Sequence, residues 1–198
     1  MAEITAGLVK DLREKTGAGM MDCKNALVES GGDMENAIEI LRKKGIARAS
    51  KKADRAVNEG RIEAYIHPGS KLGVIVEINC ETDFVANTDD FKNFAHDVAM
   101  QIAASSPLYV RREDVAGELI DHEMEIYKEQ ARSQGKPENI LEKIANGKLD
   151  KFYSEICLME QPFVKDPDKT IDTLVTETIS KLGENISIRR FTRFKVGE

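Results

Sequence analysis

Residues 61–80 read RIEAYIHPGSKLGVIVEINC, and this stretch decides the class of the fold. Apolar side chains recur at every second position on both sides of Pro68-Gly69, which is the spacing of two β-strands joined by a turn. The recurring residues are Ile62, Ala64 and Ile66 before the turn and Leu72, Val74, Val76, Ile78 and Cys80 after it. We expect a β-hairpin that buries these side chains on one face.

The chain that follows this hairpin returns to helical spacing. One apolar stripe ends at Ser105-Ser106-Pro107 and consists of Phe91, Phe94, Ala95, Val98 and Ile102. Further helices are expected over roughly 114–134, from Pro137 to about 156, and over about 171–182. The prolines within 161–167 indicate a loop.

A last strand is expected from Ile186. Its alternation slips near Arg189-Arg190, because Phe191 falls on the opposite face from Phe194. A β-bulge or a strand buried on both faces would explain the slip. Together these patterns predict an α+β fold whose core consists of antiparallel strands packed with helices.

The chain before the hairpin carries three short helical patterns. Thr5 is expected to cap the first, which breaks at residues 16–19, Thr-Gly-Ala-Gly. The second runs from about Met21 to Ser30, and Asp33 is expected to cap a third that ends at Gly45. We predict a three-helix module over 1–45, a basic helical connector over 46–59 and an α+β core domain over 60–198.

Residues 42–55 are strongly basic. One acid, Asp54, accompanies seven cations, which are Arg42, Lys43, Lys44, Arg48, Lys51, Lys52 and Arg55. A solvated linker with cations near a helix C-terminus would explain this run, and so would a nucleic-acid-binding surface. No aromatic residue interleaves to stack on bases, which favours the linker.

The composition excludes several classes of protein. The 198 residues are 41% hydrophobic and 32% charged, and no apolar run reaches the about 18 residues of a membrane span. The net charge of −6 means that any polyanion binding needs a local patch. Cys23, Cys80 and Cys157 are far apart, which favours buried thiols over disulfides or a zinc site. The first residues, MAEIT, lack the features of a signal peptide, and we expect a cytoplasmic protein.

Motifs for bond chemistry are missing from the sequence. Residues 17–19, Gly-Ala-Gly, lack the third glycine of a dinucleotide fingerprint, and no GxxxxGK[ST] phosphate loop occurs. The three histidines, His67, His96 and His122, do not have metal-binding spacing. An enzyme that uses Cys80 or Asp83 stays an alternative, but burial of Cys80 beside carboxylates disfavours a thiolate. We therefore expect no catalytic residue, no cofactor and no metal site.

The loop after the hairpin, Thr82-Asp83-Phe84-Val85, places an acid beside a large apolar ring. In one interpretation Phe84 packs on its own core, and Asp83 or Asn87 caps the next helix. In the other, the loop protrudes and the ring enters a crevice of a partner protein. Met20-Met21, at the turn between the first two helices, is a second candidate contact, although a methionine pair is often core filler.

Four separated stretches resemble one known family, translation elongation factor Ts. They are Thr16-Gly-Ala-Gly-Met-Met-Asp-Cys-Lys24, Asn79-Cys-Glu-Thr-Asp-Phe-Val-Ala86, Gln161-Pro-Phe-Val164 and Gly183-Glu-Asn-Ile186 followed by Arg-Arg-Phe. The resemblance implies a ubiquitin-associated-like three-helix module joined to an α+β core. It also implies a guanine-nucleotide exchange factor without bond chemistry. Such a factor binds elongation factor Tu in its GDP-bound and nucleotide-free forms and promotes GDP release.

The resemblance also assigns residues. It implies that Thr82, Asp83, Phe84 and Val85 intrude beside the partner's nucleotide site and displace its magnesium ion. Contacts of the N-terminal module with the partner would fall on Lys10, Leu12, Met20 and Met21. No direct binding to nucleic acid or membrane is expected.

Longer family members carry a duplicated core and a coiled-coil insertion, from which this sequence departs as a short form with a single core. Short forms are expected to form homodimers. The strand from Ile186 to Phe194 is therefore the candidate for a sheet completed across a two-fold axis.

Overall fold

The computed structural model describes residues 4–198 and divides them into two units. The first unit consists of the described residues up to Arg61, with Ile78–Phe94 and Thr173–Ser187. The second consists of Ile62–Glu77, Ala95–Asp172 and Ile188–Glu198. The domain boundaries proposed above stay a prediction, and the first three residues of the predicted module lie outside the described residues.

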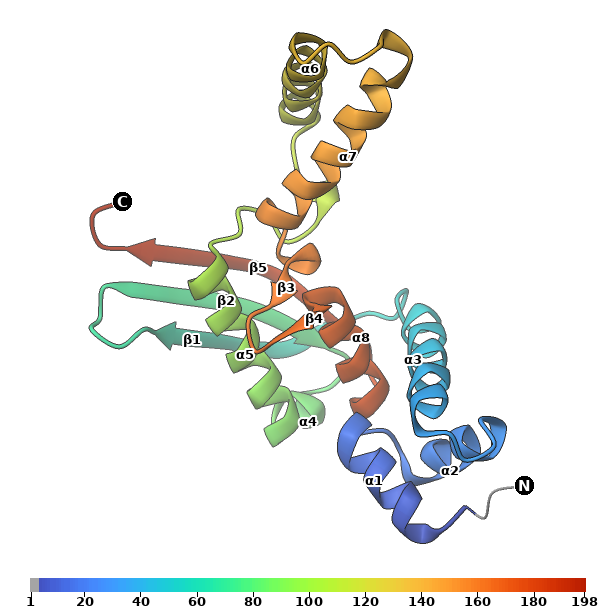
Figure 1. The fold of residues 1–198 in the computed structure, drawn as a ribbon. Helices are drawn as coiled ribbons and strands as arrows, with labels where there is room; N and C mark the ends of the chain where they lie inside the picture. The colour runs from blue at the N-terminus through green and yellow to red at the C-terminus, as the bar shows by residue number, and fades with distance from the viewer. Residues whose placement is uncertain (1–3) are drawn as a thin grey trace. The chain divides into compact units, whose positions relative to one another are not determined.

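Three helices open the first unit (Figure 1): α1 (Ala6–Thr16), α2 (Met20–Glu29) and α3 (Met34–Ser50). Both predicted caps are confirmed, because the Thr5 side chain accepts from the Leu8 amide and the Asp33 side chain accepts from the Asn36 amide. Gly17 ends α1 in the left-handed conformation. The helices share a small core of Val9, Leu12, Cys23, Ala26, Leu27 and Ala37.

The predicted end of the third helix at Gly45 is wrong, because α3 continues to Ser50. Gly45 is buried, and a Cβ built on it would lie 3.6 Å from the hydroxyl oxygen of Ser180 in α8 (Ile171–Leu182). The small residue therefore serves a close approach between two helices, and tertiary packing overrides its tendency to end a helix. The basic segment forms the second half of α3 and the turn that follows.

A three-stranded sheet has the order β1 (Glu59–Ile66), β2 (Leu72–Cys80), β5 (Ile186–Lys195). The predicted turn closes with a hydrogen bond from the His67 amide to the Leu72 carbonyl. The predicted alternation is confirmed on β2, where Val74, Val76, Ile78 and Cys80 are buried. The end of β5 lies along the start of β2, since the Val196 amide donates to the Lys71 carbonyl.

The prediction for the buried face of β1 is wrong. Ile62 is 67% exposed and Ile66 is 63% exposed, whereas Glu63 and Tyr65 are half-buried. The Tyr65 ring meets His96 of α5 (Asp89–Ser105) at 5.6 Å. Large side chains occupy both the odd and the even positions of β1, so the alternation of the strand alone does not show which face is buried. The pairing of β1 with β2 determines the buried face.

The expected slip in the last strand is confirmed as a change of phase in burial. Ile186 and Ile188 are buried, Arg189 and Arg190 are both exposed, and Phe191 is half-buried. Both arginines reach the carboxylate of Glu77, at 3.4 and 2.7 Å. Consecutive residues thus share one partner, which regular alternation would not permit.

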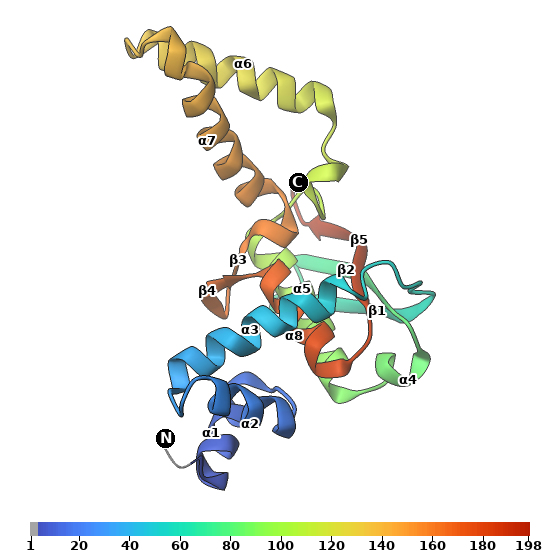
Figure 2. The ribbon, with the colours of Figure 1, turned by 90° about the vertical axis from the view of Figure 1, so that its right-hand side faces the viewer.

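Two long helices, α6 (Gly117–Ser133) and α7 (Glu138–Ile156), form a helical hairpin, and Figures 1 and 2 show them diverging from the turn that joins them. It buries Ala131, Leu141 and Ala145, and the Lys148 amine donates to the Gln130 side chain at 2.7 Å. Both helices agree with their sequence patterns.

The predicted loop over 161–167 is wrong in part. β3 (Pro162–Phe163) and β4 (Asp166–Thr170) pair as a small antiparallel sheet, with Pro162 opposite Thr170. A two-stranded sheet consists only of edges, where proline is tolerated. The short elements are α4 (Asp83–Ala86) and the 3-10 turns η1 (Arg112–Asp114) and η2 (Leu158–Glu160).

The observed class is α+β, as predicted: three N-terminal helices followed by antiparallel strands packed with helices. Within residues 4–198, no helix is long and apolar enough to cross a membrane.

Candidate functional site

The loop after β2 forms the short helix α4, from which Phe84 points into solvent. Its side chain is 79% exposed, the highest exposure among the large hydrophobic residues that the structure describes. The interpretation in which Phe84 packs on its own core is therefore wrong. A ring of this size in water is unfavourable for the isolated chain, which favours a contact with a partner.

Thr82 begins α4 and holds its first turn. The Thr82 hydroxyl accepts from the Val85 amide at 3.4 Å, and Asn87 donates to the Asp83 carbonyl from its side chain at 2.9 Å. Neither Asp83 nor Asn87 caps the next helix as expected. Instead, the Thr88 hydroxyl accepts from the Phe91 amide at the start of α5. Two threonine caps therefore fix both ends of the loop.

The base of the loop is buried. Val85 and Ala86 are each 6% exposed, and the Cys80 thiol donates to the Thr82 carbonyl at 3.1 Å. Burial, with a further effect from the Glu184 carboxylate, raises the pKa of Cys80 to about 11. The thiol is thus neutral near pH 7, which argues against a nucleophilic role and leaves Cys80 as a packed donor below the loop.

The four predicted loop residues divide into two pairs. Asp83 and Phe84 are exposed and available to a partner, whereas Val85 is buried, and Thr82, although exposed, uses its hydroxyl for hydrogen bonds within the chain. In the N-terminal module, Met20 and Met21 are exposed at the start of α2, and Lys10 is exposed on α1. Leu12, the remaining predicted contact, is fully buried in the core of the module and is not available to a partner in this structure.

The sequence interpretation missed two residues that hold the loop. Glu184 accepts hydrogen bonds from both the amide and the hydroxyl of Thr82, and the Asn185 amide donates to Glu81 at 2.7 Å. The only signal in the sequence was the stretch Gly183-Glu-Asn-Ile186, whose partner lies 102 residues away.

The basic segment is engaged within the protein. Arg48 donates to both carboxylate oxygens of Asp22 at 2.7 and 2.8 Å and lowers the pKa of Asp22. Lys44 pairs with Glu29 at 2.6 Å, and Lys52 donates to the Gly183 carbonyl. These pairs support the interpretation of this segment as a structural connector.

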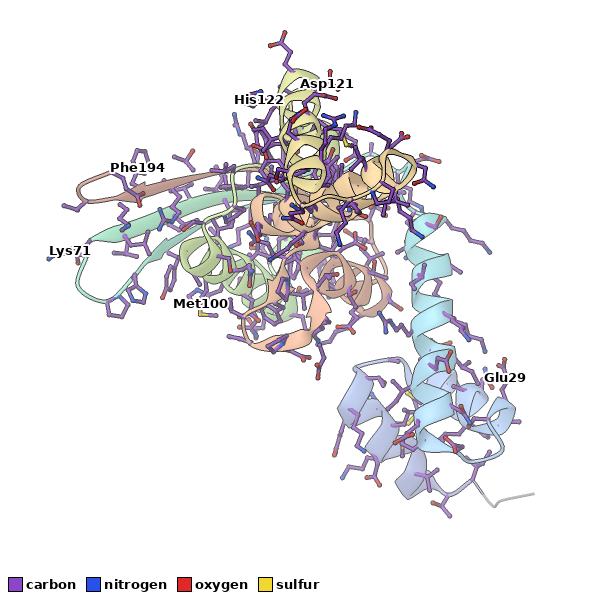
Figure 3. The ribbon with its side chains drawn as sticks, turned by 45° about the horizontal axis from the view of Figure 1, so that its top comes forward. Glu29, Lys71, Met100, Asp121, His122 and Phe194 are labelled. Atoms are coloured by element: carbon purple, nitrogen blue, oxygen red, sulfur yellow. The ribbon has the colours of Figure 1, made fainter. Side chains whose placement is uncertain are left out.

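A second exposed apolar surface lies on the sheet, on the face opposite to the buried residues of β2. We call it the open sheet face, and it consists of Ile62, Ile66, Ile75 and Phe194, each at least 49% exposed. Ile66 lies across Gly73, where a Cβ would come within 3.0 Å of its terminal carbon. Figure 3 shows Phe194 projecting from β5.

Possible metal ligands are scattered over the described residues. Over residues 4–198, no three His, Cys, Asp or Glu side chains are placed to hold a metal ion. His96 faces Glu63 at 3.5 Å, and the Tyr65 hydroxyl lies 3.0 Å from His67.

The fold and these surfaces define a class: an α+β protein that presents an exposed ring on a rigidly held loop, as suits a protein that binds another protein. Similarity to known proteins narrows the class. The model of the family described as "Elongation factor TS" matches residues 22–198. The elongation factor Ts of Carboxydothermus hydrogenoformans is 64% identical over 98% of this chain and 90% of the relative. Those of Geobacter sulfurreducens and Thermoanaerobacter sp. strain X514 are 62% and 60% identical over 98% of this chain, and over 90% and 96% of the relatives. The chain belongs to the elongation factor Ts family, whose members act in the elongation stage of protein biosynthesis.

Proposed function

We propose that this protein is a guanine-nucleotide exchange factor for elongation factor Tu, acting in the cytoplasm without making or breaking covalent bonds. Membership of the family supports this role. The observation that carries the proposal is the ring of Phe84, 79% exposed on a helix whose base is buried and capped.

The proposed mechanism is displacement of the partner's magnesium ion. Magnesium in a GTPase bridges nucleotide phosphate and protein side chains, and it demands near-octahedral oxygen ligands. A loop that shifts those ligands slightly therefore weakens GDP binding. Phe84 supplies the apolar anchor and Asp83 a polar contact, while Val85 and Thr82 hold the loop from below.

Linkage sets the energetics of this exchange. If the factor lowers the affinity of elongation factor Tu for GDP, GDP must lower the affinity of elongation factor Tu for the factor by the same ratio. The factor should therefore bind the nucleotide-free partner more tightly than the GDP-bound one. Met20, Met21 and Lys10 form the proposed contact surface of the N-terminal module.

The test is release of fluorescent GDP from elongation factor Tu in a stopped-flow instrument. The protein should accelerate GDP release, and Phe84→Ala should lower the saturating release rate by about tenfold or more. An exposed apolar residue outside both the loop and the open sheet face, Leu108→Ala, serves as control and should keep the rate. Equal GDP release with and without the protein would rule out the proposed function.

The alternative of nucleic-acid binding through the basic segment has a separate test. Because Arg48, Lys44 and Lys52 already have partners, we expect no RNA affinity that falls steeply with salt. Tight, salt-sensitive binding of a single-stranded RNA at 50 mM salt would favour the alternative.

We also propose that two copies pair. The sequence placed this contact on the strand from Ile186 to Phe194, as a sheet completed across a two-fold axis, and we extend the proposed contact to the open sheet face, to which Phe194 belongs. The residues of this face are apolar and exposed in the single chain, and Ile66, Ile75 and Phe194 line one hollow on the surface. A face of this kind on a soluble protein is typical of an interface. A two-fold pair would place the same residues of each copy against one another. Light scattering at micromolar concentration should give twice the chain mass, and a monomeric mass would contradict the pairing.

A further inference from the structure

The stretch Gly183-Glu-Asn-Ile186 stands out in the sequence, yet the proposed exchange mechanism gives it no role. In the structure it meets the residues that lead into α4. Glu184 binds Thr82 through both carboxylate oxygens: Oε2 accepts from the amide at 3.0 Å, and Oε1 accepts from the hydroxyl at 2.6 Å.

The adjacent residues make the converse contact. Glu81 accepts from the Asn185 backbone amide at 2.7 Å, and this bond is the main cause that lowers the pKa of Glu81. Two neighbouring residues at the end of β2 and two before β5 are therefore joined in both directions. We call Glu81, Thr82, Glu184 and Asn185 the reciprocal clasp.

The clasp is also tied to the turn after α3. The side chain of Asn185, which is 7% exposed, donates to the carbonyls of Ala53 and Arg55 at 3.2 and 2.9 Å. Arg55 in turn reaches Glu81 at 3.4 Å. Because both amide donors of this buried side chain are satisfied by these carbonyls, displacing it would leave them unpaired, and the segment that bears Glu184 is itself held in place.

The role of Glu184 follows from the chemistry of a hydroxyl group. A threonine hydroxyl has one proton to donate and two lone pairs that accept. Because Glu184 takes the proton, the lone pairs of Thr82 are left for the Val85 amide, which is the cap of α4. The carboxylate therefore orients the hydroxyl that starts the helix carrying Phe84.

We propose that Glu184 is a positioning residue for nucleotide exchange: it sets the direction in which Phe84 leaves the protein by fixing the rotor of Thr82. The inference rests on the proposed exchange function. Glu184 touches neither nucleotide nor magnesium in this scheme. It acts through Thr82, so its removal should loosen α4 without exposing the core.

The first test needs no partner. In the free chain, Glu184→Ala should speed amide hydrogen exchange at residues 82–87 by about tenfold, since each tenfold corresponds to the free energy of about one such bond. Amides in the middle of α5 should keep their protection. Unchanged protection of residues 82–87 would overturn the proposal, whatever the exchange assay gives.

The second test separates positioning from contact. With elongation factor Tu, Glu184→Ala should lower the saturating GDP-release rate about tenfold, while the half-saturating concentration changes less than about threefold. Glu184→Gln keeps the side-chain volume and one acceptor, so its rate should lie between those of Glu184→Ala and the unsubstituted chain. A raised half-saturating concentration with an unchanged maximal rate would identify a contact residue and refute positioning.

Two further variants close the argument. In the double variant Glu184→Ala with Phe84→Ala, the loss should equal that of Phe84→Ala alone, because Glu184 acts through the ring. Asp90→Ala is the matched control: the Asp90 carboxylate of α5 also makes a long-range contact, with Lys181 of α8 at 2.7 Å, but it lies outside the clasp. It should keep the full rate, and additive losses in the double variant would contradict the proposal.

If the unsubstituted protein does not accelerate GDP release, the proposed function fails, and the hydrogen-exchange test still decides whether Glu184 holds the loop. If release is accelerated and depends on Phe84 but not on Glu184, only the positioning role fails.

Discussion

The loop at α4 and the open sheet face expose apolar side chains in different ways. At α4 one ring protrudes from a helix whose neighbours are buried or hydrogen-bonded, and Phe84 is 79% exposed. On the sheet, four exposed apolar side chains are spread over three strands. A single ring on a fixed helix suits a transient contact, in which it enters a partner and leaves again. A broad apolar surface suits a lasting interface in which the surface stays buried.

The two regions also differ in what supports them. The loop depends on polar contacts, because Thr82 is fixed by Glu184 and by the thiol of Cys80. The sheet depends on strand pairing and on the ion pairs of Arg189 and Arg190 with Glu77, and Gly73 leaves room for Ile66. Substitutions in the loop should therefore change the rate of nucleotide exchange and leave the oligomeric mass in solution unchanged. Substitutions on the open sheet face should change the oligomeric mass and leave the exchange rate unchanged.

The largest effect is expected from charges on the open sheet face. Ile66→Asp with Phe194→Asp would place four carboxylates in a two-fold interface and weaken pairing by at least about 5 kcal/mol. Analytical ultracentrifugation should show monomers. The far-ultraviolet circular dichroism of the variant should match that of the original chain, because both residues are exposed in the single chain. A dimer that persists would show that the copies pair elsewhere or that the face has another role.

Two phenylalanines seven positions apart allow a matched comparison. Phe91 is fully buried at the start of α5 and packs edge-on against Phe94, with 6.4 Å between the two ring centroids. Phe91→Ala should lower the free energy of unfolding by about 3–5 kcal/mol. Phe84→Ala should change it by less than about 0.5 kcal/mol, because an exposed ring contributes little to folding.

Urea denaturation of both variants measures this difference. A large loss of stability in Phe84→Ala would mean that the ring packs on its own protein in solution, and the loop would then lose its claim to be a contact for a partner.

The outcome for the two regions shows how far sequence patterns reach. Alternation along residues 72–80 predicted β2 and its buried face correctly, because only one phase of that strand is consistently apolar. On β1 both phases carry large side chains, so the pairing of strands decided the exposure of Ile62 and Ile66. Local patterns predict an element well, but its environment depends on distant residues.

The candidate site was likewise only partly predictable. The sequence singled out the residues of the loop but not their exposure, since an Asp-Phe pair after a strand is compatible with a ring packed on its own core and with a ring that protrudes. Glu184 could not be connected to Thr82, because a hydrogen bond across 102 residues leaves no local pattern. The continuation of α3 through Gly45 likewise depends on Ser180, far along the chain.

A pH experiment tests the buried base of the loop. Burial raises the pKa of Cys80 from about 9 to about 11, so the folded protein favours the neutral thiol. Its contribution to stability is present below pH 9 and is lost as the pH rises toward 11, by about 2 kcal/mol. Cys157, whose pKa is also raised to about 11, contributes in the same direction.

Comparing Cys80→Ala with Cys157→Ala separates the two thiols. The free energy of unfolding of each variant should fall less between pH 8.5 and pH 10.5 than that of the original chain, by about 1–2 kcal/mol. Of the two variants, Cys157→Ala keeps the Cys80 thiol below the loop. Amide protection at residues 82–87 should therefore fall as the pH rises in Cys157→Ala, as in the original chain, but not in Cys80→Ala. Equal pH dependence in all three proteins would contradict the assigned burial effect.

The smallest effect is expected from Phe84→Leu, which shortens the contact but keeps it apolar. If burial of apolar surface in the partner is what Phe84 provides, leucine should retain most of the saturating GDP-release rate, with a loss of about threefold to fivefold. Phe84→Asn, polar and not much smaller than leucine, is the control and should lose nearly as much as Phe84→Ala. Equal losses for leucine and asparagine would mean that the ring itself, through its shape or its π face, makes the contact. In that case the loop would recognise its partner through the aromatic ring rather than through apolar area, and it would differ from the mainly aliphatic open sheet face in chemistry as well as in area.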